Sequence, residues 1–416
     1  MPAKPVTVAV IGAGGRGIGF GRLLASTPLW GRVVAVAEPR PEYREAFAAA
    51  HALTPDRVFR DWRELVALPK LADAVIIATM DRDHVGPAVA CTALGYHMFL
   101  EKPMATTLED CEAIAASQRK AGTITSVCHS LRYHKAFALL KDIVSSGRIG
   151  ATVSVDQLEQ VAWWHQAHSF VRGNWGNESR SSPMLLAKSC HDLDYIAFLV
   201  ARPCRRVSSF GSLTYFTPRN APAGSGERCV ECAVEPECPY SAIRHYILGN
   251  RASWPASAIA HEHSEQAHWE AIRRGPYGRC VWKTDNDVVD HQVVAMEFDG
   301  QVTATFTMTA FTQRGGRKIR VHGTEGEVEF TDEWLELRTF RDNSTQRIVP
   351  GSEPGGHGGG DHRVLLSFLR AVAAGDPSLV TSDVQESLAT HRIVFAAERS
   401  RREGRTVELG SAAQER

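Results

Sequence analysis

The chain has 416 residues; its 47 lysines and arginines balance 47 aspartates and glutamates, and 44% of its residues are hydrophobic. A chain of this length is longer than one hydrophobic core usually accommodates, so we expect two domains. Zero formal net charge argues against nucleic acid or an anionic membrane as a partner. The first five residues lead directly into an apolar strand without a leader, and no apolar run is long enough to span a bilayer. We therefore expect a cytoplasmic protein with no membrane partner.

A glycine-rich turn follows the first predicted strand. Residues 6–11 form an apolar run, and residues 18–24 are predicted to be helical. Glycines between a buried strand and a helix start bring backbone N–H groups close to a pyrophosphate, at the positive end of the helix dipole. The turn therefore predicts a dinucleotide site, with contacts from Gly12, Gly14, Gly15, Arg16 and Gly17.

The second predicted strand, residues 32–37, ends in Glu38, 21 residues after Gly17. An acidic side chain at this place accepts hydrogen bonds from the ribose hydroxyls of the adenosine. Because Glu38 would repel a 2′-phosphate, we expect NAD as the cofactor. Arg40 keeps NADP open as an alternative, since an arginine pairs with that phosphate.

Strands and helices alternate up to about residue 130. Short apolar strands are expected at 74–79, 97–100 and 125–128, and helices at 42–51, 85–94 and 108–121. This alternation predicts an α/β domain over residues 1–130, a Rossmann-type, doubly wound parallel sheet. Its ligands belong at the carboxyl ends of the strands. Polar candidates for the cofactor site at or just beyond these ends are Thr79, His84, Glu101, Lys102 and Arg132.

Several motifs carry a resemblance to a known family. Glu101-Lys102-Pro103 directly follows a strand, Thr79 precedes His84, and His191 begins a His-x-x-Asp motif. Together with the glycine turn, these motifs resemble the Gfo/Idh/MocA family of NAD(P)-dependent oxidoreductases over nearly the whole chain. The resemblance implies that Lys102 contacts both the nicotinamide region and the substrate hydroxyl. It also implies that His191 is the active-site histidine near that hydroxyl.

Residues 131–416 form the second expected domain, of the α+β class. We expect a helix at 135–145, strands at 152–158, 205–213, 290–298, 302–309, 318–323, 326–331 and 334–341, and closing helices at 361–374 and 382–402. The resemblance implies that the strands build a large open, mainly antiparallel sheet whose inner face covers the nicotinamide. It also implies a subunit interface on the far face, so we expect a homodimer or homotetramer.

Residues 163–175 hold three tryptophans, two histidines and an arginine in 13 positions. Aromatic planes stack on the apolar faces of sugar rings, and the polar groups hydrogen-bond sugar hydroxyls. We therefore expect a carbohydrate substrate; the competing interpretation is a partly buried loop whose aromatic side chains fill the core. The candidate substrate contacts are Trp164, His165, His168, Arg172 and Trp175, together with Asp192 beside the active-site histidine.

The neighbourhood of His191 departs from the family pattern. Relatives often carry an aspartate four residues before this histidine, whereas this chain has Ala187 there, followed by Lys188. A direct transfer of an Asp–His proton relay is therefore not supported. We expect Lys188 to join Lys102 and His191 in a cationic, hydroxyl-binding catalytic cluster, in which a lysine beside a second lysine serves as a base. The competing interpretation of His191 is a histidine satisfied at a helix start.

An insertion at about 220–280 contains Cys229-x-x-Cys232 and Cys238. Three thiolates at this spacing suit a structural zinc ion. Cys280, Cys204 and His245 compete for the fourth position, with Cys280 the first choice. The competing interpretation is a set of unrelated buried thiols, because a C-x-x-C without a second pair is half of a zinc signature.

We expect hydride transfer between NAD and a secondary alcohol carbon, C3 in particular, of a pyranose sugar or glycoside, with Lys102 and His191 binding or deprotonating the hydroxyl. Some members of the family that the chain resembles are glycoside hydrolases: they oxidise C3, eliminate the aglycone, add water and reduce the ketone again. Such activity, on an anionic glycoside such as a sulfoquinovoside, is the alternative. A non-enzymatic NAD-dependent regulator is disfavoured by the intact Glu101-Lys102-Pro103.

Overall fold

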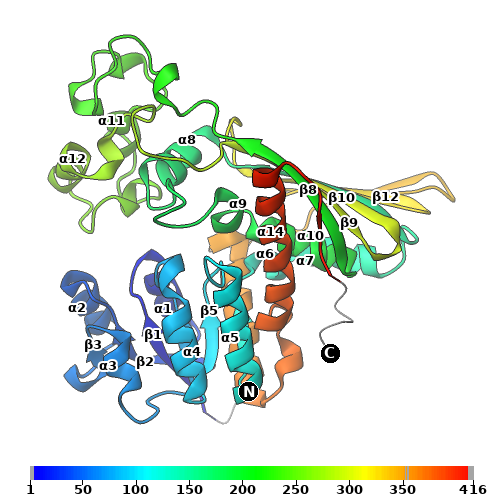
Figure 1. Cartoon of the computed structure of the whole chain (residues 1–416). Helices are drawn as coiled ribbons and strands as arrows, with labels where there is room; N and C mark the ends of the chain where they lie inside the picture. Colours follow the sequence, from blue (N-terminus) through cyan, green and yellow to red (C-terminus); the bar gives the residue numbers. More distant parts are fainter. Residues whose placement is uncertain (1–3, 352, 354–355, 411–416) are drawn as a thin grey trace.

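The computed structural model describes residues 4–351, 353 and 356–410 (Figure 1). Residues 1–3, part of the N-terminal stretch that is expected to lack a leader, lie outside this description. A parallel sheet of six strands, in the order β3-β2-β1-β4-β5-β6, forms the N-terminal part. The strands are β1 (Val6–Ile11), β2 (Gly31–Ala37), β3 (Val58–Phe59), β4 (Ala74–Ile77), β5 (His97–Leu100) and β6 (Thr125–Val127). The helices between them are α1 (Gly15–Ser26), α2 (Pro41–Ala50), α3 (Trp62–Val66), α4 (Val85–Ala93) and α5 (Leu108–Ala121).

The central strands of this sheet are apolar almost throughout. All four residues of β4 are buried, and five of the six residues of β1 are buried as well. A parallel sheet needs such strands because helices cover both of its faces. The predicted Rossmann-type domain is therefore confirmed.

The second sheet has nine strands, in the order β14-β13-β12-β11-β7-β10-β9-β8-β15. Neighbouring strands are antiparallel except β7 and β10, which are parallel. The strands are β7 (Thr152–Gln160), β8 (Cys204–Ser212), β9 (His291–Phe298), β10 (Val302–Thr309), β11 (Gly316–Gly323), β12 (Gly326–Thr331), β13 (Leu335–Thr339), β14 (Ser344–Ile348) and β15 (Val407–Glu408). The predicted open, mainly antiparallel sheet is confirmed. Strand β14 was not expected, because its polar residues face solvent and carry no alternating pattern.

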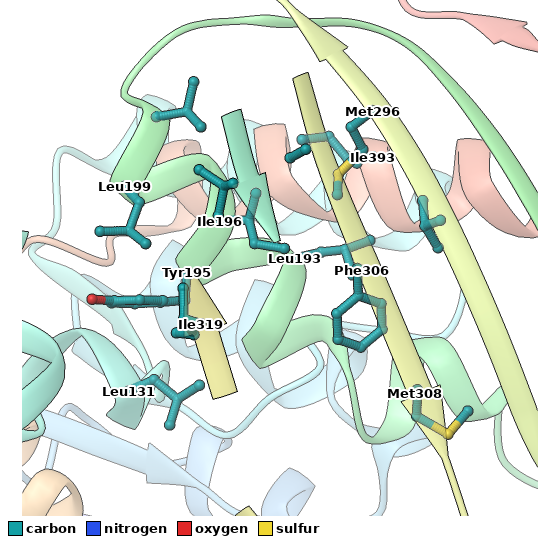
Figure 2. Packing of buried hydrophobic residues seen from close by; sticks show 14 of the residues in the cluster. Leu131, Leu193, Tyr195, Ile196, Leu199, Met296, Phe306, Met308, Ile319 and Ile393 are labelled. Atoms are coloured by element: carbon teal, nitrogen blue, oxygen red, sulfur yellow. The ribbon is translucent and has the colours of Figure 1, made fainter. Parts of the chain in front are cut away.

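One face of the second sheet is covered by helices. The covering helices are α6 (Ser130–Tyr133), α7 (Lys135–Ser145), α9 (Met184–Ala187) and α10 (Cys190–Val200). Strand β10 alternates strictly, so that Phe306 and Met308 are buried while Thr307 between them faces solvent. Figure 2 shows Phe306 beside Leu193 of α10, and Met308 and Ile196 belong to the same hydrophobic cluster. This packing fixes α10, which carries His191, on the inner face of the sheet.

The last two long helices return to the first sheet. Helix α13 (Gly360–Ala374) packs Phe368 and Leu369 into the core that contains β1, and α14 (Val384–Glu403) contributes Val384 and Leu388 to the core on the other face. The division expected at residue 130 remains a prediction, because C-terminal residues complete the N-terminal core.

The insertion has a small core of its own. Helices α11 (Ala242–Tyr246) and α12 (Glu265–Arg274) enclose Tyr246 and Ile272. Figure 1 shows the insertion above α2, and the rings of Tyr43 on α2 and His261 lie 4.7 Å apart. The insertion therefore reaches the nucleotide-binding side of the first sheet. Among the described helices, none combines the length and apolar character needed to cross a membrane.

Candidate active site

The glycine turn between β1 and α1 has no room for a side chain at Gly12 or Gly17. Gly12 has a φ of +89°, and a Cβ there would lie 2.6 Å from the Ala78 carbonyl oxygen. A Cβ on Gly17 would lie 1.9 Å from the Gly12 carbonyl oxygen. No side chain caps α1, and a Cβ on Gly15 would meet nothing within 4 Å. The first N–H groups of α1 therefore remain open to a pyrophosphate, as an NAD site requires.

Glu38 lies beside this turn at the end of β2. Its carboxylate accepts hydrogen bonds from the Ala13 N–H (2.8 Å) and from Arg40 Nε (2.7 Å). Burial raises the pKa of Glu38, but the hydrogen bonds from Arg40 and Ala13 outweigh it, and the pKa is lowered. An ionised Glu38 suits ribose hydroxyls and repels a 2′-phosphate. Arg40 forms an ion pair with Glu38 and lies over the Tyr43 ring. The side chain that would pair with the 2′-phosphate of NADP therefore already has partners in this structure.

Arg16 joins the end of β5 to α13. It forms ion pairs with Glu101 and Asp361, each at 2.6 Å. Although burial lowers the pKa of Arg16, the two carboxylates raise it well above the usual value. Asp361 also accepts from His357 Nδ1 at 2.9 Å. Arg16 and Glu101 thus pair with each other, and cofactor contacts from them remain a prediction.

Lys102 reaches from the first sheet to the second domain. The Lys102–Pro103 bond is cis, and Lys102 Nζ donates to the Ala187 carbonyl oxygen at 2.8 Å. His84 Nδ1 lies 2.8 Å from the Pro103 carbonyl oxygen, so it steadies the same turn. Thr79 follows β4 next to Gly12, since a Cβ on Gly12 would lie 2.9 Å from the Thr79 nitrogen. Thr79 and Lys102 therefore lie at the carboxyl edge of the first sheet, where they were expected.

His191 lies in the first turn of α10 and is buried. Neither ring nitrogen has a hydrogen-bond partner among the described residues. Its ring centroid lies 5.8 Å from that of His129 and 5.5 Å from that of His357. Burial, followed by the charge of Lys102, lowers the pKa of His191 well below its ordinary value. A neutral imidazole has one donor and one acceptor, and both are free for a hydroxyl. His191 is therefore not a histidine satisfied at a helix start.

Lys188 belongs to a buried cluster of charged side chains. Its Nζ lies 2.7 Å from Oε1 of Glu159, and Arg317 Nε lies 2.9 Å from the other oxygen of this carboxylate. Arg317 also pairs with Asp192 at 2.8 Å, and Gln157 donates to Asp192 at 2.6 Å. Sequence reasoning missed Glu159 and Arg317. The available signal was a charged residue at an inward-facing position of β7, since alternate residues of this strand are buried.

The tryptophan-rich segment packs against the insertion. It forms α8 (Trp163–His165) and a π-helical turn, Gln166–Arg172. The Trp164 and His165 rings lie beside Trp254, with centroids 5.3 and 4.8 Å away. Burial, and then the charge of Lys188, lowers the pKa of His165 well below its ordinary value. The positive charge of Lys188 thus disfavours protonation of His165.

Arg172 and His168 also point into the insertion, and the His168 ring lies 5.5 Å from that of Trp254 as well. Arg172 is buried and donates to the carbonyl oxygens of Arg279 (2.7 Å) and Tyr240 (2.8 Å). His168 lies 3.0 Å from the Tyr246 hydroxyl and stacks on Tyr277. These side chains fasten the insertion to the domain, and the structure does not bring them to Lys102. The interpretation as core-filling residues is the better one for them.

Three other candidates also have structural partners. Trp175 Nε1 donates to Asp81 at 3.0 Å, which closes the segment onto the first domain. Arg132 forms two 2.7 Å hydrogen bonds to Asp194, and both side chains are almost fully buried. Asp192 is fully buried beneath Arg317. Arg132 therefore points away from solvent into an ion pair, and the aspartate of the His-x-x-Asp motif is its partner.

The nine cysteines are all free thiols. Among the described residues, no three His, Cys, Asp or Glu side chains converge into a group that could hold a metal ion. Four cysteines nevertheless line a single cavity with a free volume of about 10 Å³: Cys229, Cys232, Cys238 and Cys280. Of the competitors for the fourth position, Cys204 lies on β8, and His245 contacts the Pro239 carbonyl oxygen at 3.0 Å. The predicted cysteines are therefore neighbours, but they do not form a ligand shell.

The fold and the nucleotide site define a two-domain, NAD-dependent oxidoreductase. Residues 6–129 match the description "Oxidoreductase family, NAD-binding Rossmann fold" and residues 141–409 match "Oxidoreductase family, C-terminal alpha/beta domain". The chain belongs to the Gfo/Idh/MocA oxidoreductase family.

Similar proteins have been described in several bacteria. The putative oxidoreductase YteT of Bacillus subtilis is 25% identical over 70% of this chain and 71% of its own length. Inositol 2-dehydrogenase 2 of Saccharopolyspora erythraea is 28% identical over 47% of this chain, which spans about half (54%) of that relative. Levoglucosan dehydrogenase in complex with NADH and L-sorbose shares the fold, with a TM-score of 0.72, 18% identity and 98% and 99% of the two chains covered.

Proposed function

We propose that the protein transfers hydride to or from a secondary alcohol carbon, C3 in particular, of a pyranose sugar or glycoside. NAD is the proposed cofactor, and NADP is less favoured because Arg40 is bound to Glu38. The names of similar proteins support a ring polyol as the substrate, since they include inositol and levoglucosan dehydrogenases. The aromatic side chains of Trp164 and Trp254 support contact with a sugar face.

The observation that carries the proposal is the pair of unpartnered nitrogens on buried His191. The acceptor nitrogen of the neutral ring would take the proton of the substrate hydroxyl, while the Lys102 ammonium hydrogen-bonds the oxygen as its carbon changes oxidation state. When bound, NAD supplies the hydride acceptor. The open N-terminus of α1 and the carboxylate of Glu38 would hold its pyrophosphate and adenosine ribose.

The alternative is a glycoside hydrolase that oxidises C3 transiently. A C3 ketone acidifies the C2–H bond, so elimination of the aglycone needs a second proton acceptor besides His191. The Lys188–Glu159 pair is a second group capable of proton transfer, and this observation favours the alternative. The cations that would bind an anionic substrate such as a sulfoquinovoside are Lys102 and Lys188, because Arg172 and His168 form contacts with the insertion.

A proton NMR time course in D2O separates these activities. Purified enzyme would be mixed with catalytic NAD and, in turn, each of a panel of neutral and anionic methyl glycosides. Free sugar with deuterium at C2 and no net NADH would show a redox glycosidase. A ketoglycoside that accumulates only with stoichiometric NAD, and less with NADP, would show a dehydrogenase. If no sugar in the panel changes, the proposed substrate class is wrong.

We also propose that the insertion holds a structural zinc ion in the cavity between its four cysteines. The cavity has room for about one atom, and the four thiols would have to turn toward it. Arg172 supports the proposal: its Nη2 donates to Cys229 Sγ at 3.4 Å, and its buried Nη1 has no partner. A guanidinium at this place would offset the negative charge of thiolates.

Metal analysis tests the zinc proposal. Protein from zinc-supplied cells, dialysed without chelator, should contain about one zinc per chain, and a Cys232→Ser variant should contain almost none. Because zinc would pin the insertion, this variant should also unfold at a lower temperature. Cys204→Ser is the matched control and should retain the metal. Wild-type protein without zinc, or equal zinc in both variants, would contradict the proposal.

Finally, we propose a cytoplasmic homodimer or homotetramer. Phe210 and Val293 pair across β8 and β9 and are exposed on the face of the sheet away from the helices. An apolar pair on an otherwise uncovered sheet face supports self-association, and light scattering at several concentrations would measure it. The free thiols support a reducing compartment, which cell fractionation would test.

A further inference from the structure

A buried cluster of charges lies on the inner face of the second sheet. Glu159 of β7 contacts Lys188 through Oε1, and Arg317 of β11 lies between Glu159 and Asp192. Two carboxylates and two cations leave the cluster neutral. A buried charge costs several kcal/mol unless it is paired, so each of these groups depends on its neighbours. Replacing one of them will change the electrostatic environment of the others.

Glu159 keeps an unused oxygen within this cluster. Its Oε2 has no hydrogen-bond partner although Arg317 Nε is 2.9 Å away, since the hydrogen on that nitrogen is directed at Asp192. Burial raises the pKa of Glu159 by more than the charges of Arg317 and Lys188 lower it. Glu159 is therefore a carboxylate that can take up a proton.

Lys188 links Glu159 to the site of the proposed chemistry. Its side chain is 16% exposed, against 1% for Glu159, so Lys188 is the more accessible partner of the pair. The Ala187 carbonyl oxygen, one residue earlier, accepts the hydrogen bond from Lys102 Nζ. The charges of both lysines act on His165 of α8. Lys188 therefore contacts Glu159 through its side chain, and its chain neighbour Ala187 holds Lys102.

We propose that Glu159 is a positioning residue that holds Lys188 at the active site and takes up its proton. Glu159 Oε1 accepts a proton from the Lys188 ammonium, so one Nζ–H bond breaks and one O–H bond forms. The lone pair left on Nζ then accepts a proton from the substrate, whose bonding electrons remain on the substrate. The net change is one proton moved from substrate to Glu159, and the role of this transfer in turnover rests on the proposed function.

Competitive labelling with trace acetic anhydride tests the pair without any sugar, because only the free amine reacts. Mass spectrometry would follow acetylation of Lys188 against pH in the full-length protein. In Glu159→Gln, Lys188 keeps its cationic neighbours but loses its carboxylate, so half-maximal labelling should occur at least about one pH unit lower than in wild type. Glu159→Asp should behave like wild type, as should Asp156→Asn, which removes an exposed carboxylate from the same strand. Equal profiles in wild type and Glu159→Gln would overturn the proposal.

Turnover of a sugar identified by NMR gives the second readout. Glu159→Gln should lower kcat about a hundredfold at neutral pH with little change in KM. The acid limb of its pH profile should move upward by at least about one pH unit, because Lys188 must then lose its own proton. Glu159→Asp should restore most of the rate. If labelling shifts but the panel yields no turnover, the proposed function fails while the pairing stands; shifted labelling with unchanged kcat would refute proton uptake by Glu159.

Discussion

A Lys102→Met variant should lose roughly a thousandfold in kcat and far less in its affinity for NAD. Methionine has a similar length but no donor, so the hydroxyl oxygen would lose its ammonium partner as charge develops on it. The glycine turn and Glu38 are unchanged in this variant and should still hold the pyrophosphate and the adenosine ribose. Stopped-flow measurement of NADH formation, with fluorescence titration of NADH binding, would separate the two effects.

The Lys102 side chain also joins the first domain to α9 through the Ala187 carbonyl oxygen, so the control variant must lose a comparable hydrogen bond. Lys141 donates to the Phe198 carbonyl oxygen at 2.7 Å, outside the site. Lys141→Met removes a bond of the same kind and should retain kcat within a few fold. Turnover by Lys102→Met within tenfold of wild type would show that the ammonium does not take part in the chemistry.

An Asp194→Asn variant should lose about 3–5 kcal/mol of stability at neutral pH. Asp194 accepts two hydrogen bonds from Arg132, and the asparagine would leave a buried guanidinium without a counter-charge. Urea unfolding followed by tryptophan fluorescence measures this loss. Asp56→Asn, which removes one partner of an exposed pair with Arg57, is the control and should stay close to wild type.

The pKa of Asp194 also determines how the stability of the protein depends on pH. Burial raises the pKa of Asp194, but Arg132 and His129 outweigh it, so the pKa is lowered in the folded state. A carboxyl group with a lowered pKa in the folded state stabilises the protein when the pH is above its pKa in the unfolded state, near 3.9. This contribution disappears as the pH falls through the pKa of the folded state. The gap between wild type and Asp194→Asn should therefore be constant above about pH 5 and narrow below pH 4. A gap that widens in acid would contradict this assignment.

The sequence alone was sufficient to predict strands such as β1 and β10, the glycine turn and the acidic residue of the nucleotide site, because these features depend on residues that are close together in the chain. Apolar runs such as Val6–Ile11, a turn that excludes side chains at Gly12 and an acid at the end of the next strand are read from neighbouring residues. The period of two in β10 places its strand and its buried face. These features are predictable because backbone conformation and the burial of alternate side chains are set within a few residues.

Only the tertiary structure decided which distant side chains meet. Glu159 and Arg317 are far apart in the chain and join Lys188 because β7 and β11 pair in the second sheet. Arg172 belongs to a segment that predicted sugar contact, yet it donates to carbonyl groups of the insertion. Such pairings leave no local pattern: they follow from sheet register and from the need of each buried charge for a partner, which the completed packing alone satisfies.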